Sequence, residues 1–173
     1  VIHDDNHIAM AKIDGAHTVI TLHPHEDKPL RVFSYRTPKG DKRDVIEHTH
    51  RFGSRAFSAK VPSTLKGTVL RGEVWAQGKD GKPLATTRVG GLLNANVWKS
   101  RENQKEHGDL EVAVFDVIRH KGKDVSLLPF GEKLDILRSV SKQVPLLKLP
   151  AIAETSAEKH HLVKSVLSGK HPQ

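Results

Sequence analysis

The stretch from residue 109 to 120, DLEVAVFDVIRH, limits the possible folds of this chain more than any other part of its sequence. It contains neither glycine nor proline, and apolar and β-branched residues dominate it, which is typical of a strand. Strict alternation divides its side chains between two faces, with Leu110, Val112, Val114, Asp116 and Ile118 on one and Glu111, Ala113, Phe115 and Val117 on the other. Because both faces are mostly apolar, we predict a central strand that is largely buried.

Earlier segments have a similar strand-like composition. Residues 17–23 and 29–36 are rich in β-branched and aromatic residues and are joined by the polar stretch PHEDK, which predicts a β-meander. The stretch GTVLRGEVWAQGKDGKPLATTRV repeats this pattern, and we expect GKDGK to form the tip of a hairpin within it. In the strand before that tip, alternation places Glu73 on the same face as Arg71 and Trp75.

The hydrophobic period changes in the last third of the chain. One helical stripe, with spacings of three, three and four residues, is formed by Leu134, Leu137, Val140 and Val144. A second helix is predicted where Thr155 and Glu158 form a capping box, with Gly169 as its C-terminal cap. The segment VPLLKLPAI between them predicts an extended link, and the polar NANVWKSRENQKEHG predicts helix and loop. Strands first and helices later indicate the α+β class.

The charge of the chain favours a polyanionic partner. Lys and Arg number 28 against 20 Asp and Glu, which gives a net charge of +8, and the basic residues are spread along the chain. A field of this sign concentrates phosphate-bearing ligands, although an ordinary soluble basic protein has the same balance. Aromatic residues make up only 5% of the chain, so a broad stacking platform for single-stranded nucleic acid is not expected.

Missing residue types and patterns narrow the class of protein further. The chain has no cysteine, which excludes a disulfide framework and a thiolate metal site. No run approaches the ~20 apolar residues of a membrane span, and the start lacks the pattern of a signal peptide. We therefore expect a single-domain, soluble, intracellular protein that does not act at a membrane.

Twelve histidines raise the question of a metal site. HPH at 23–25, HTH at 48–50 and HH at 160–161 have no carboxylate or third histidine at a recognisable ligand spacing, so we predict histidines at the surface. RVGG at 88–91 lacks the lysine and hydroxyl residue of a phosphate-binding loop and predicts a bend.

The tetrapeptide KIDG, from Lys12 to Gly15, has two interpretations. It can be a strand that ends in a tight turn, where Asp14 bonds the local backbone and Gly15 supplies a positive φ. It can also be a lysine nucleophile with its supporting residues. The tetrapeptide alone does not decide between them.

Four motifs in order resemble the adenylation domain of an ATP-dependent DNA ligase, in the superfamily that includes RNA ligases and mRNA capping enzymes. KIDG matches the nucleophile motif, and FSYR with Arg36 lies where the family has a serine and arginine motif. LRGEVW with Glu73 matches the L-x-G-E strand, and VFDVI with Phe115 matches the F-D-hydrophobic strand. LLPFGEKLDIL resembles the lead into a helix that follows that strand. The resemblance implies the ligase and capping-enzyme nucleotidyltransferase fold, which is ATP-grasp-like, with packed antiparallel sheets and flanking helices.

For the nucleophile motif, the resemblance implies covalent chemistry. Lys12 would attack the α-phosphate of ATP and form a lysyl-AMP phosphoramidate, after partial burial or a cation such as Mg²⁺ or Mn²⁺ lowers its pKa. Asp14 would hold the loop rather than react. Gly15 would let the backbone approach the nucleotide without a Cβ in the way.

The other matching residues would bind the nucleotide. By resemblance, Arg36 contacts the ribose or a nucleic-acid phosphate, with a strand-edge salt bridge as the alternative. Glu73 binds the ribose or a metal-bound water, which makes it the candidate metal residue. Phe115 stacks on the adenine, with a plain core position as the alternative. The partner implied is nicked duplex DNA, whose strand is sealed after AMP passes to its 5′-phosphate, and we expect a monomer.

The sequence also departs from the family pattern. Met10 and His17 stand where the family often has a glutamate and an arginine, and the later E-G-hydrophobic and K-x-K motifs are not found. We therefore expect residues 1–173 to be a partial adenylation domain, without the oligonucleotide-binding domain, that forms little lysyl-AMP alone. The alternatives are an RNA ligase or capping-type guanylyltransferase, and a non-catalytic nucleic-acid-binding module.

The net charge of +8 generates a prediction about DNA binding. Affinity for duplex DNA should be largely independent of sequence, and its logarithm should fall linearly with the logarithm of the salt concentration as counterions are released. A salt titration by fluorescence anisotropy measures this slope. An affinity that does not change with salt would show that the basic excess serves only solubility.

Overall fold

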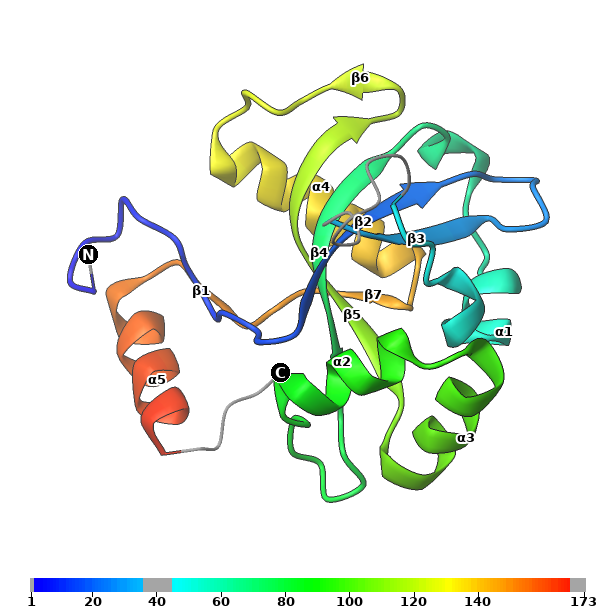
Figure 1. The fold of residues 1–173 in the computed structure, drawn as a ribbon. Coiled ribbons are helices and arrows are strands. Elements are labelled where there is room, and N and C mark those ends of the chain that lie inside the picture. The colour runs from blue at the N-terminus through cyan, green and yellow to red at the C-terminus, as the bar shows by residue number, and fades with distance from the viewer. Residues whose placement is uncertain (1, 36–44, 169–173) are drawn as a thin grey trace.

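The computed structural model of the chain describes residues 2–35 and 45–168. Its strands are β1 (Ala9–Met10), β2 (Ala16–Leu22), β3 (Leu30–Ser34), β4 (Val69–Ala76), β5 (Leu110–His120), β6 (Lys123–Asp124), β7 (Leu147–Lys148) and β8 (Ile152–Ala153). Its helices are α1 (Ser54–Phe57), α2 (Thr86–Asn94), α3 (Val97–His107), α4 (Phe130–Gln143) and α5 (Ser156–Leu167), with short 3₁₀ turns at Thr49–Phe52 and Ser63–Leu65. Figure 1 shows α4 crossing behind the sheet, while α5 stands apart beside the N-terminus.

A curled sheet forms the centre of the molecule (Figure 1). Its strand order is β3-β2-β4-β5-β6, with antiparallel neighbours throughout, and β7 adds to β5 as a parallel neighbour. The meander of β2 and β3 and the central position of β5 confirm the sequence prediction. A second sheet contains only β1 and β8. The α+β class with antiparallel sheets and flanking helices is therefore confirmed, with the second sheet reduced to a two-stranded ribbon.

The main hydrophobic core lies between one face of this sheet and the helices. Leu70 and Val74 of β4 belong to it, together with Val112 and Val114 of β5. The predicted stripe of α4 is buried completely, and three of its members, Leu137, Val140 and Val144, belong to the same cluster. Because burial of such a side chain contributes roughly 1.5–3 kcal/mol, this stripe fixes α4 against the sheet.

Strict alternation along β5 fails after Val114. Gly72 pairs with Val114 but Arg71 pairs with Asp116, so Phe115 is an extra residue in a β-bulge, and a second register shift follows at Ile118. As a result Val114 and Val117 both lie in the main core. The predicted face is therefore right for Phe115, which lies on the side of Ala113, and wrong for Val117, because the bulge shifts the two-residue period by one.

The stretch after β4 is also different from the prediction. No second hairpin strand follows GKDGK among the described residues. A single bridge joins Gln77 to Pro83, and helix α2 begins at Thr86. RVGG, predicted as a bend, lies inside this helix. The core contacts of Val89, Leu92 and Leu93 override the weak helix propensity of the two glycines. Because α1, α2 and α3 precede β5, the prediction that strands come first and helices later is also wrong.

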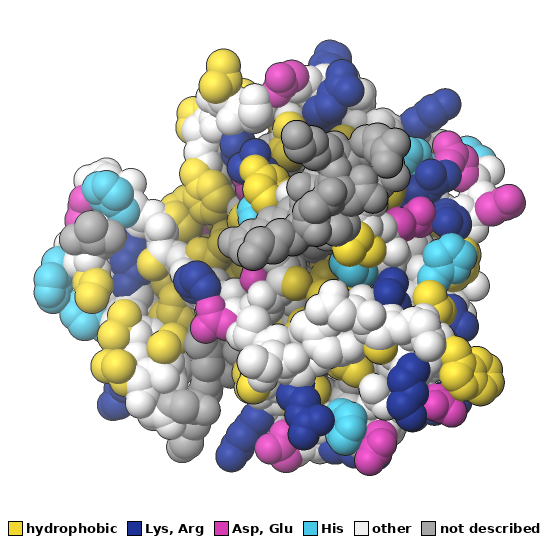
Figure 2. Space-filling view, in the orientation of Figure 1, with side chains coloured by type: hydrophobic (Ala, Val, Ile, Leu, Met, Phe, Trp, Pro, Cys, Tyr) yellow, Lys and Arg dark blue, Asp and Glu magenta, His cyan; other side chains and the backbone are white. Residues whose placement is uncertain are grey.

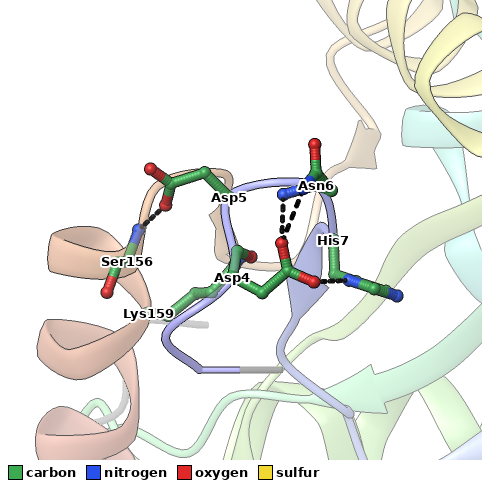
Figure 3. Close-up of polar contacts among 6 residues, drawn as sticks. All are labelled: Asp4, Asp5, Asn6, His7, Ser156 and Lys159. Atoms are coloured by element: carbon green, nitrogen blue, oxygen red, sulfur yellow. Dashed lines mark hydrogen bonds and ion pairs between the residues drawn. The ribbon is translucent and has the colours of Figure 1, made fainter.

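Helix α5 and residues 2–10 form a lobe beside the main body (Figure 1). The Thr155–Glu158 capping box is present as predicted, whereas the predicted cap Gly169 lies outside the described residues. The N–H of Ser156 donates to Asp5 Oδ1 at 2.5 Å, and the buried Lys159 donates from Nζ to the carbonyl of Asp4 (Figure 3).

No helix within the described ranges is both long enough and apolar enough to cross a membrane.

The burial of Lys159 predicts how this lobe is stabilised. Lys159→Ala leaves a void and removes the hydrogen bond between α5 and the Asp4 carbonyl, so the free energy of opening α5 should fall by about 2 kcal/mol or more. Lys164→Ala, at an exposed position on the same helix, is the control. Hydrogen exchange of the α5 amides measures both, and equal protection in the two variants would contradict the prediction.

Candidate active site

A cavity of about 400 Å³ opens where residues 10–13 run past the face of β4 and β5 that is turned away from the main core. This is within the range of about 300–1,000 Å³ that is usual for small-molecule sites. Its lining consists of Met10, Ala11, Lys12, Ile13, Glu73, Ala113, Phe115, Phe130 and Pro150. Figure 2 shows apolar side chains exposed between the α5 lobe and the sheet. The structure therefore brings together Lys12, Glu73 and Phe115, which come from three separate motifs.

The KIDG segment lies between β1 and β2 and is held from both sides. Before it, the N–H of Ala11 donates to the carbonyl of Ala151 at 2.8 Å. At its end, the N–H of Gly15 donates to Glu73 Oε1 at 3.1 Å, although the two residues are 58 positions apart. The segment therefore leads into a strand and is not a turn that ends one.

Gly15 is required for a reason that the sequence did not indicate. Its φ is not positive. A Cβ at this position would lie 2.0 Å from the carbonyl oxygen of Val74 on β4, closer than any real contact. The missing side chain lets the KIDG segment lie directly against β4, next to Glu73.

Lys12 is exposed, so partial burial, one of the two ways considered for lowering its pKa, does not apply. Its side chain is 84% exposed, that of Asp14 is 75% exposed, and the two form an ion pair through Nζ and Oδ1. The hydrogen bond and charge of Asp14, with a smaller effect of Glu73, raise the pKa of Lys12 above its usual value. Asp14 therefore contacts the amine directly and keeps it protonated.

Glu73, unlike Lys12, is half-buried. Burial raises the pKa of its carboxyl group, while the hydrogen bond from Gly15 and the charge of Lys12 act to lower it. Within residues 2–35 and 45–168, no three histidine or acidic side chains are grouped so that they could hold a metal ion. A cation at this site would therefore need other ligands besides Glu73, such as phosphate oxygens.

Aromatic and basic side chains continue along the same face of the sheet. His17 lies opposite Glu73 in the β2–β4 register, and its ring stacks on Tyr35 at a centroid distance of 4.1 Å. The ring of Phe115 is 5.5 Å from that of His17, and the Arg71 guanidinium lies 5.7 Å from the Tyr35 ring centroid. Arg36 lies outside the described residues.

Sequence reasoning missed several residues near this site and misjudged one histidine. Phe130 and Pro150 line the cavity. Phe130 stands in LLPFGEKLDIL, three residues before Lys133, and a helical projection of that stretch would place both on one face. His48, predicted at the surface, is only 6% exposed, and burial with the nearby charge of Arg51 lowers its pKa to about 4.

The arrangement of these elements is the ligase-type nucleotidyltransferase fold, as comparison with solved structures shows. The chain is similar to mycobacterial DNA ligase D complexed with ATP and MES, with a TM-score of 0.56 and 14% identity over 94% of this chain and 44% of that one. It is also similar to the ligase domain of LigD from M. tuberculosis, with a TM-score of 0.57 and 16% identity over 92% of this chain and 44% of that one. The chain thus spans less than half the length of either structure. No family model and no curated protein matches the sequence.

The Lys12–Asp14 contact predicts how reactive the amine is. Asp14→Asn removes the charge that raises the Lys12 pKa, so a larger fraction of Lys12 should be neutral at pH 8 and its acetylation should be faster. Peptide mass spectrometry gives the rate at Lys12, with Lys79 as an internal reference and Asp27→Asn as a matched control. An unchanged rate at Lys12 would mean that Asp14 does not control its protonation.

Proposed function

We propose that this chain is the nucleotide-transferring part of an ATP-dependent DNA ligase, with Lys12 as its nucleophile. One observation carries the proposal: Lys12, Glu73 and Phe115, chosen from three separate motifs, line one cavity. The fold supports it, because a solved structure with the same fold is a DNA ligase in complex with ATP.

The residues present fit a purine nucleotide. The lining is apolar apart from Lys12 and Glu73, which suits a flat base that needs shape and stacking more than charge. Phe115 offers an aromatic face for the base, and the carboxylate of Glu73 can accept a hydrogen bond from a ribose hydroxyl. The exposed amine of Lys12 can then reach the phosphates.

The first step forms a bond between Lys12 Nζ and the α-phosphorus of ATP and breaks the bond from that phosphorus to pyrophosphate. Lys12 must first lose a proton and leave Asp14, because a protonated amine has no free electron pair. Glu73, together with phosphate oxygens, would hold Mg²⁺ or Mn²⁺, and such an ion neutralises the charge of the triphosphate. The hydrogen bond from Gly15 keeps Glu73 beside the nucleophile segment.

Two displacements at phosphorus complete the proposed reaction. The AMP passes from Lys12 to the 5′-phosphate of a DNA nick, and the 3′-hydroxyl then displaces the AMP and seals the strand. Both steps depend on positioning and charge neutralisation rather than on further covalent chemistry by the protein. The net charge of +8 supports a nucleic-acid substrate.

The covalent intermediate gives the decisive test. In the intact protein, Lys12→Arg should abolish the AMP adduct, because a guanidinium stays protonated and cannot attack. The adduct is detected by intact-mass spectrometry after incubation with ATP and Mg²⁺, with Lys79→Arg as the control. Parallel incubation with GTP distinguishes a ligase from a capping-type guanylyltransferase.

An acid-labile AMP adduct that persists in Lys12→Arg would remove Lys12 from the mechanism. Failure of the unchanged intact protein to form any adduct would instead favour a nucleic-acid-binding module that has the fold without the chemistry.

A further inference from the structure

The bulge in β5 places Asp116 beside Phe115. Phe115 lines the cavity with Ala113, two residues before it, and has no partner in the β4–β5 register, and the bulge pairs the following Asp116 with Arg71. Asp116 Oδ1 accepts a hydrogen bond from the N–H of Val117 at 2.9 Å, which stabilises the irregular backbone. Arg71, on the neighbouring strand, lies 3.8 Å from Asp116 Oδ2.

Helix α4 is tied to this bulge by one ion pair. Lys133 donates from Nζ to Asp116 Oδ1 at 3.0 Å, and its side chain is only 11% exposed. A pair this shielded from water is screened less by salt than a surface pair. One helical turn before Lys133, Phe130 begins α4 and lies on the same side of the helix, because residues three apart are neighbours on a helix surface.

The ion pair therefore links two aromatic residues that line one cavity. Phe115 precedes Asp116 on β5, and Phe130 precedes Lys133 on α4. Phe130 remains 38% exposed although it is a large apolar side chain. An aromatic ring left open to solvent at a cavity, with a second ring on another element, is an arrangement suited to a flat aromatic ligand.

We propose that Phe130 is a second base-contacting residue, and that Asp116 and Lys133 are positioning residues that set its place relative to Phe115. This inference rests on the proposed function and deepens it, because it assigns the wall of the site that faces the purine base of the nucleotide. The base contacts aromatic side chains from both β5 and α4, and the Lys133–Asp116 pair holds these two elements together.

The test measures base stacking directly. The probe is 2-aminopurine riboside triphosphate, whose fluorescence is quenched when its base stacks, and Lys12→Arg serves as the starting protein so that the signal reports binding alone. Phe130→Ala should weaken probe binding about tenfold and reduce the quenching, because base–aromatic stacking contributes about that much. Phe130→Tyr keeps the ring and should retain both. Leu127→Ala, at a position that is 97% exposed and outside the lining, is the matched control.

Inorganic triphosphate separates a base contact from a folding defect. Its affinity should be the same in Phe130→Ala and in the starting protein, because Phe130 contacts only the base. For the positioning pair, Lys133→Met should reduce the quenching and Lys133→Arg should restore it.

The inference is overturned if Phe130→Ala binds and quenches the probe as well as Leu127→Ala does. It is also overturned if Phe130→Ala weakens the binding of inorganic triphosphate and of the probe equally. If quenching is unchanged in Lys133→Met, the ion pair does not position the two aromatic residues. If the starting protein binds no probe and the intact protein forms no adduct, the proposed function fails as well. If the intact protein forms the AMP adduct but Phe130→Ala changes neither probe binding nor quenching, this inference alone is overturned.

Discussion

The antiparallel pairing of β4 with β2 and β5 is the constraint on which the rest of the structure depends. Alternation along β4 sends Leu70 and Val74 into the main core, while Glu73 lies on the opposite face beside the cavity. The backbone hydrogen bonds of β4 hold the site residues in place. The free energy that stabilises this pairing comes from burial of the core face of the same strand. Because the site residues contribute little to that core, they can be chosen for chemistry.

Two departures from regular pairing shape the cavity side of this ladder. The close approach of Gly15 to Val74 places the KIDG segment against β4, where the N–H of Gly15 donates to Glu73. The bulge in β5 brings Asp116 beside Phe115 while both Val114 and Val117 lie in the core. Both are local irregularities of a kind that is costly unless the surrounding structure supports it, and both occur beside the candidate site.

The electrostatics of the site favour the protonated forms of both Lys12 and Glu73. Lys12 is exposed and paired with Asp14, which favours its protonated form, while burial favours the neutral form of Glu73. A bound triphosphate would compete with Asp14 for the amine, and a cation near Glu73 would favour its ionised form. The chemistry proposed here therefore requires the nucleotide to change the protonation of both residues, and the fold holds them close enough for one ligand to do so.

The sequence by itself determined the elements whose pattern is local. The period of Leu134, Leu137 and Val140 is that of a helix with one apolar face, and the capping box at Thr155 marks a helix start through its own hydrogen bonds. The motif residues Lys12, Glu73 and Phe115 were also identified from sequence, since each belongs to a short stretch of recognisable residue types. Their meeting at one cavity could be expected only through the resemblance to a known family.

Only the tertiary structure decided the features that depend on distant contacts. Helix α2 forms across two glycines because its apolar residues reach the core, and the side that Val117 takes depends on a bulge that no alternation pattern contains. The exposure of Lys12 and the position of Phe130 at the cavity follow from how β1, β5 and α4 are placed relative to one another. The physical reason is that local propensities differ by less than about 1 kcal/mol per residue, whereas burial and close packing contribute more, so contacts between distant segments determine the geometry of the site.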